Sequence, residues 1–188
     1  MVAQDLLSRI QTRRATVGII GLGYVGLPLA ILASQKGYSV VGLLRDSTKL
    51  KDLQQGNTTV DTISKKDLLR VLRSEKLRLK KLESSALSNI DVIIMCVPTP
   101  ITNKKKPDLS AMKSVARFLS SADMRGKLII NESTVAPGTT RELLAKVSEF
   151  LACSPERVGP GNRTQSTATI PKVVGGVNEQ STKMASAF

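Results

Sequence analysis

Three glycines mark a predicted junction between a strand and a helix near the start of the chain. Gly21, Gly23 and Gly26 follow the apolar run 16–20 and open a segment with helical apolar spacing, which lasts to about residue 36. A dinucleotide needs such a junction, because its pyrophosphate must approach bare backbone and the N-terminal end of a helix. Gly21 would permit the tight turn, Gly23 would leave room for the phosphates, and Gly26 would let the helix approach the strand. A chance glycine turn is the alternative, and the flanking strand and helix favour the dinucleotide site.

Strand and helix patterns alternate along the rest of the chain. Apolar runs predict further strands at 38–44, 77–82, 91–97, 127–131 and 151–153. Helical patterns occupy 5–12, 47–55, a segment from 64, 108–122, and a segment from 138 to near 150. This alternation predicts an α/β fold with a doubly wound, mostly parallel Rossmann-type sheet and helices on both faces. We expect residues 1–15 to form an N-terminal helical extension and residues 16–188 to form the dinucleotide-binding domain.

Charge and composition narrow the chemistry. The formal net charge of +13 suits anionic partners, but outside 104–106 the basic residues are scattered and aromatic residues are scarce. We therefore expect a solvated loop there and no nucleic-acid partner, with nucleic-acid binding as a minor alternative. The chain has no histidine, which excludes Ser-His-Asp catalysis and most zinc sites, so no metal is expected. Its two cysteines make no disulfide framework and no apolar run has the length of a membrane span, so we expect a cytoplasmic protein without membrane contact.

The end of the second predicted strand departs from the usual dinucleotide pattern. Such domains place an acidic side chain about 20 residues beyond the glycines, where it holds the adenosine ribose. Here Leu44 and Arg45 come first, and the acid is Asp46. We expect Asp46 to reach the ribose from this later position. Alternatively, Arg45 binds a 2′-phosphate and favours NADP, cofactor binding is weakened, or Asp46 only caps the next helix.

Seven segments together resemble one known family. They are residues 21–30, 96–100, 107–110, 132–140, 154–158, 160–162 and 171–176. In this order they resemble the N-terminal NAD-binding domain of the UDP-glucose/GDP-mannose dehydrogenase family. The string Ser-Pro-Glu-Arg-Val at 154–158, with the following Pro-Gly-Asn, looks most like the enzymes that act on UDP-N-acetylglucosamine or UDP-N-acetylmannosamine. The similarity runs from about residue 16 to the end.

The resemblance implies an activity for the complete enzyme. Such an oxidoreductase oxidises the C6 alcohol of a UDP-N-acetylhexosamine to the uronic acid with two NAD, as in polysaccharide biosynthesis. The family's catalytic cysteine and lysine lie in later parts of a longer chain, and neither Cys96 nor Cys153 falls in a matching motif. We therefore expect this chain to bind NAD without turning over substrate, and to form a homodimer only with the central domain. Oxidation of UDP-glucose or GDP-mannose, or a free-standing nucleotide-binding module, are the alternatives.

The resemblance also implies roles for individual residues. Cofactor contacts are implied for Gly21, Gly23, Tyr24, Val25, Gly26, Asp46, Lys49, Thr99 and Thr134. In this set the backbone at Tyr24 and Val25 meets the pyrophosphate, and Lys49 lies near the adenosine. The predicted helix that ends near residue 150 leaves a shorter connection to the next strand than the family usually has.

Catalytic and substrate roles fall at the end of the predicted sheet. Thr134 is implied to help position a catalytic water, and Glu156 matches a family glutamate that works as a general base or activates water. A carboxylate suits this work if burial raises its pKa toward neutrality. Arg157 and Val158 match positions that border the nucleotide-sugar. From the residues alone, a surface ion pair is the preferred interpretation of Glu156 and Arg157.

Overall fold

A computed structural model describes residues 2–157 and 167–188 of the chain. Its centre is a seven-stranded sheet in the order β3-β2-β1-β4-β5-β6-β7. The strands are β1 Thr16–Ile20, β2 Ser39–Leu44, β3 Leu77–Lys81, β4 Val92–Met95, β5 Leu128–Asn131, β6 Phe150–Cys153 and β7 Gly175–Gly176. Neighbouring strands run parallel, except that β7 is antiparallel to β6. The predicted, mostly parallel sheet is confirmed.

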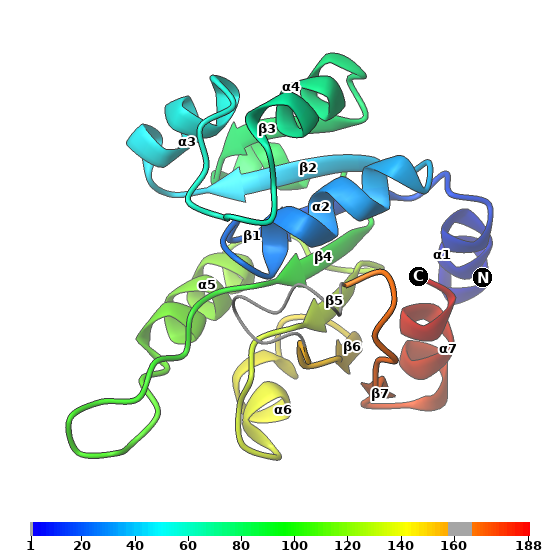
Figure 1. Ribbon diagram of the computed structural model, residues 1–188. Coiled ribbons are helices and arrows are strands. Elements are labelled where there is room, and N and C mark those ends of the chain that lie inside the picture. Colours follow the sequence, from blue (N-terminus) through cyan, green and yellow to red (C-terminus); the bar gives the residue numbers. More distant parts are fainter. Residues whose placement is uncertain (1, 158–166) are drawn as a thin grey trace.

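Helices cover both faces of this sheet (Figure 1). They are α1 Val2–Gln11, α2 Gly26–Gln35, α3 Ser47–Gln54, α4 Lys65–Arg73, the short 3₁₀ helix η1 Ser84–Leu87, α5 Ser110–Ser120, α6 Thr139–Leu144 and α7 Glu179–Ala187. One core cluster joins the sheet to α1, α2, α4 and α7, and a second joins the opposite face to α5 and α6. The doubly wound arrangement is therefore confirmed. Among the described helices, none combines the length and the apolar character needed to cross a bilayer.

The central strands are apolar without interruption because both of their faces are buried. In β4, Val92 and Ile94 pack into the core cluster on one face, whereas Ile93 and Met95 pack into the cluster on the other. Successive side chains of a strand point to opposite faces, so a strand between two helical layers needs an apolar residue at every position. This explains why the run at 91–97 gives a strong strand signal.

The end of α6 corrects a prediction. A helix from residue 138 to near 150 was expected, but α6 ends at Leu144 and β6 already begins at Phe150. The hydroxyl of Ser148 donates to the carbonyl of Lys127 at 2.7 Å and accepts from the N–H of Phe150 at 3.1 Å. These bonds tie the segment to the start of β5 and prevent the helix from continuing. A loop of residues 145–149 therefore separates α6 from β6, and its length relative to other family members stays a prediction.

The two described ends of the chain lie together. Helix α1, of which the sequence predicts the part from residue 5 onward, lies beside α7, which the sequence analysis did not predict (Figure 1). Leu6 and Ile10 of α1 are buried in the same core cluster as Met184 of α7. Tyr38 completes the contact, because its hydroxyl donates to the carbonyl of Ile10 at 2.9 Å. The division into an extension at 1–15 and a domain at 16–188 stays a prediction.

Candidate functional site

A groove of about 1070 Å³ lies at the carboxyl ends of the parallel strands. It opens where the chain order reverses between β1 and β4, which is where ligands bind in open α/β sheets. The expected site residues that line it are Gly21, Gly23, Tyr24, Val25, Asp46, Lys49, Thr99, Thr134 and Glu156. Gly26 and Arg157 are not among its lining residues, and Val158 lies outside the described residues.

The three glycines of the turn between β1 and α2 meet different steric demands. Gly21 has a φ of +92°, and a Cβ there would lie 2.5 Å from the carbonyl oxygen of Cys96. A Cβ on Gly26 would lie only 1.9 Å from the carbonyl oxygen of Gly21. A Cβ on Gly23 would meet nothing within 4 Å. The fold therefore requires the first and third glycines, while the second leaves space on the groove side.

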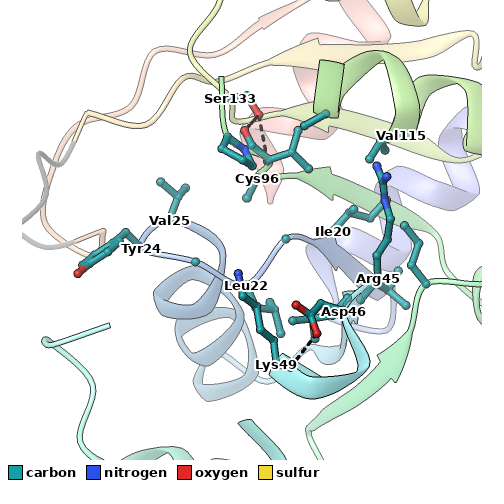
Figure 2. A pocket seen from close by; sticks show the side chains of 18 of the residues that line it. Ile20, Leu22, Tyr24, Val25, Arg45, Asp46, Lys49, Cys96, Val115 and Ser133 are labelled. Carbon is teal, nitrogen blue, oxygen red and sulfur yellow. Dashed lines mark hydrogen bonds between the residues drawn. The ribbon is translucent and has the colours of Figure 1, made fainter. Parts of the chain in front are cut away.

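The N-terminal end of α2 presents backbone to this space. Val25 holds the N-cap position, and no described side chain caps the first turn. That turn contains no acidic residue. Uncapped N–H groups and the positive end of the helix dipole together favour an anion such as a pyrophosphate. Figure 2 shows Tyr24 at the rim with its ring directed away from the groove, so at this residue the backbone faces the ligand space.

The carboxylate of Asp46 acts as a helix cap. Its Oδ1 accepts hydrogen bonds from the N–H groups of Thr48 at 2.8 Å and Lys49 at 3.1 Å, at the start of α3 (Figure 2). Leu44, at the position usual for the ribose acid, is buried in the core. The capping alternative is thus observed, and a ribose contact by Asp46 stays a prediction.

Replacing Asp46 with alanine should lower the free energy of unfolding by about 1 kcal/mol, because two N–H groups of α3 lose their acceptor. Asp46→Ser keeps an acceptor and should stay within about 0.5 kcal/mol of the parent chain. Urea unfolding followed by circular dichroism measures both values. Equal stability of all three chains would show that the cap contributes nothing.

Two glutamates and a lysine from separate segments meet at the far side of the groove. Glu132 follows β5, Glu156 follows β6, and Lys172 precedes β7. The Lys172 ammonium donates to Glu132 Oε2 and, at 3.2 Å, to Glu156 Oε2. The side chains of the two glutamates are only 5% and 7% exposed, and that of Lys172 is 21% exposed. Burial raises the pKa of Glu132, and the hydrogen bond and charge of Lys172 oppose this shift.

Cys96 lines the same groove as Glu132 and Glu156. Its backbone N–H donates to the carbonyl of Ile20 at 2.9 Å, which extends the pairing of β4 with β1. Burial, and then the negative charge of Glu132, raise the pKa of the Cys96 thiol well above its ordinary value. Since the thiolate is the nucleophilic form, Cys96 is not a candidate nucleophile. This agrees with its position outside the family's catalytic motif.

Hydroxyl groups connect the loops that follow β4 and β5. Thr99 donates its hydroxyl to the carbonyl of Thr134 at 2.8 Å. The hydroxyl of Ser133 donates to the carbonyl of Val97 at 2.8 Å and accepts from its N–H at 3.2 Å (Figure 2). The predicted pair Thr99 and Thr134 is therefore brought together at the groove.

Arg157 points to a different partner from the one expected from the residues alone. Its guanidinium donates to the carbonyl of Pro171 at 3.3 Å, and its backbone N–H donates to Glu156 Oε1 at 2.7 Å. The buried carboxylate of Glu156 instead pairs with Lys172. Glu132 and Lys172, 40 residues apart, were not predicted as site residues. The only signal was that both lie in segments that carry the family resemblance, at 132–140 and 171–176.

Comparison with known proteins decides the family. The model for the NAD binding domain of the UDP-glucose/GDP-mannose dehydrogenase family matches residues 15–188. The chain belongs to this family. It is 34% identical over 177 residues to the UDP-N-acetyl-D-mannosamine dehydrogenase of Methanococcus aeolicus, covering 89% of this chain and 40% of that protein. It is 33% identical over 171 residues to the UDP-N-acetyl-D-glucosamine 6-dehydrogenase of Pseudomonas aeruginosa, covering 85% of this chain and 39% of that protein.

Solved structures give the same result. The UDP-D-ManNAc dehydrogenase of Pyrococcus horikoshii is 31% identical with a TM-score of 0.78, over 91% of this chain and 43% of that one. An NDP-N-acetyl-D-galactosaminuronic acid dehydrogenase of Methanosarcina mazei is 28% identical with a TM-score of 0.81, over 96% and 43%. The chain thus spans about 40% of the length of its curated relatives. It is an NAD-binding domain of the nucleotide-sugar dehydrogenase family, with a Rossmann fold and NAD as its cofactor.

Proposed function

We propose that the chain is the cofactor-binding part of an enzyme that oxidises the C6 alcohol of a UDP-N-acetylhexosamine to the uronic acid with two NAD. The observation that carries the proposal is the convergence of the glycine turn, the Thr99–Thr134 pair and Glu156 on one groove. The names of the relatives from Methanococcus aeolicus and Pseudomonas aeruginosa support a UDP-N-acetylhexosamine as the substrate. Oxidation of UDP-glucose or GDP-mannose is the alternative within the same family.

The residues of the groove fit NAD in a definite direction. The space above Gly23 and the uncapped end of α2 suit the pyrophosphate, which meets the backbone at Tyr24 and Val25. Lys49 then lies toward the adenosine, and Thr99 and Thr134 lie toward the nicotinamide. Bound NAD supplies the hydride acceptor, and the chain orients it.

The substrate side of the groove is assigned to the loop after β6. Glu156 accepts a proton from, or activates, a water that Thr134 helps to position. Lys172 fixes the direction of the Glu156 carboxylate, because its ammonium binds Oε2 at 3.2 Å. Arg157 and Val158 border the nucleotide-sugar. A UDP-sugar partner, a homodimer formed through the central domain and a cytoplasmic location belong to the same proposal.

Two assays test this function. Titration of the chain into NADH should give a saturable change in nicotinamide emission. The complete product of the gene should form two NADH for each UDP-N-acetylmannosamine or UDP-N-acetylglucosamine consumed, and should act more slowly on UDP-glucose. Faster turnover of UDP-glucose would refute the substrate class. If the chain binds NADH saturably but the complete gene product turns over no nucleotide-sugar, the result would support the free-standing nucleotide-binding module.

A further inference from the structure

The adenosine end of the groove lacks the carboxylate that normally favours NAD over NADP. An acid at the end of the second strand accepts hydrogen bonds from the ribose hydroxyls, and its charge also repels a 2′-phosphate. Here Leu44 holds that position, with its side chain 8% exposed and packed into the core. Neither the acceptor nor the repulsive charge is present at this residue.

Two cations stand beside this position. Arg45, directly after β2, and Lys49, in the first turn of α3, are both exposed and both line the groove. Figure 2 shows Arg45 extending from the end of β2 in the direction of Val115, whereas the ammonium of Lys49 is directed toward Leu22. Within the described residues, neither side chain makes a hydrogen bond or an ion pair. Both are available to a ligand.

Two carboxylates also line this end of the groove. Asp46 uses Oδ1 for the two N–H groups of α3, so this oxygen is committed to the helix. Asp52 lies six residues further along the chain, in α3, and lines the groove together with residues 57–59. The residue that directly follows β2 is Arg45. Its guanidinium has a planar fork of donors that matches the oxygens of a phosphate.

We propose that the adenosine end of this groove binds a phosphate at the ribose 2′ position, with Arg45 as its main ligand and Lys49 as the second. The domain then accepts NADP(H) in addition to NAD(H). This rests on the proposed function, because both cofactors use the same glycine turn. It goes beyond it, because it assigns to Arg45 the choice of cofactor.

The test compares NADH with NADPH on the same chain. We expect NADPH to bind at least as tightly as NADH. Added salt should weaken the binding of NADPH more than that of NADH, since the 2′-phosphate of NADPH adds charge. Arg45→Met should raise the dissociation constant of NADPH about tenfold and that of NADH less than about threefold, because a charge-assisted hydrogen bond is lost only with NADPH. Lys49→Met should act in the same direction with a smaller effect.

Matched controls are available on α3 and on the neighbouring strand β3. Lys51 lies on α3 and Arg78 on β3, and both are exposed and outside the lining of the groove. Lys51→Met and Arg78→Met should leave both dissociation constants unchanged. Binding of 2′,5′-ADP compared with 5′-AMP locates the effect at the adenosine end, because neither probe carries nicotinamide.

The binding results distinguish failure of the 2′-phosphate site from failure of the proposed function. NADH binding with NADPH more than about tenfold weaker overturns the assignment of a 2′-phosphate site and leaves the proposed function intact. Equal weakening of both cofactors by Arg45→Met also overturns it, because Arg45 would then contact a part that they share. Failure of both cofactors to bind overturns the proposed function itself.

Discussion

Gly23→Ala should weaken NADH binding strongly without unfolding the chain, whereas Gly26→Ala should destabilise the fold itself. A Cβ on Gly23 meets nothing within 4 Å, so the free energy of unfolding should change by less than about 1 kcal/mol. The added methyl group occupies the space that the pyrophosphate needs, and this overpacking should raise the dissociation constant of NADH by about 100-fold. On Gly26 the Cβ would lie 1.9 Å from the Gly21 carbonyl oxygen, so α2 must move away from β1. We expect a loss of about 3 kcal/mol or more there.

Two measurements on the same pair of variants separate these effects. Urea unfolding gives the free energy of unfolding, and nicotinamide fluorescence gives the affinity for NADH. The expected result is one variant that is stable and binds NADH weakly, and one that is unstable. Tight NADH binding by Gly23→Ala would place the pyrophosphate elsewhere and contradict the proposed site. Parent-like stability of Gly26→Ala would show that α2 does not need its close approach to the turn.

Local patterns in the sequence were sufficient for the central sheet. The unbroken apolar run of β4 identifies a strand buried on both faces, and the spacing of glycines identifies the turn before α2. Each of these signals is contained within a few neighbouring residues of the sequence. The side of the groove formed by β1, β2 and β4 could therefore be predicted, including Asp46 as a possible cap of α3.

Features set by distant contacts could not be predicted in this way. The end of α6 depends on Ser148 reaching the carbonyl of Lys127 in another element. Helix α7 has a weak local pattern, and its place depends on packing against α1 and the sheet. The pairing of Lys172 with Glu132 joins residues 40 positions apart, which no periodicity reveals. The resemblance could assign a role to Glu156, but not the cation that holds it.

The buried carboxylate of Glu132 and its partner Lys172 together affect how the stability of the chain depends on pH. Glu132 has a folded-state pKa raised above the ordinary value of 4.5, chiefly because its carboxylate is buried. Between these two pKa values the folded chain holds a proton that the unfolded chain has released. Stability therefore falls as the pH rises from about 4.5 through the raised pKa of Glu132. Lys172 limits this loss, because its ammonium stabilises the ionised form.

Lys172→Met should accordingly cost about 3–5 kcal/mol of unfolding free energy at pH 8 and clearly less at pH 5, because it removes the cation that the two buried carboxylates share. Lowering the pH favours protonation of Glu132, whose raised pKa rises further without Lys172, and this removes part of the repulsion between the two carboxylates. The double variant Glu132→Gln/Lys172→Met should recover much of the loss at pH 8, since only one buried charge remains. Lys183→Met is the matched control, because its ion pair with Glu179 is on the surface, and should change stability by less than about 0.5 kcal/mol at either pH.

Urea unfolding at the two pH values measures all four chains. A Lys172→Met variant that loses the same free energy at pH 5 and pH 8 would show that the lysine acts through packing of its methylene groups. A loss that grows with pH and is relieved by Glu132→Gln identifies electrostatic pairing as the cause. In that case the ammonium of Lys172 compensates the charge that Glu132 and Glu156 bring into a buried position at the groove.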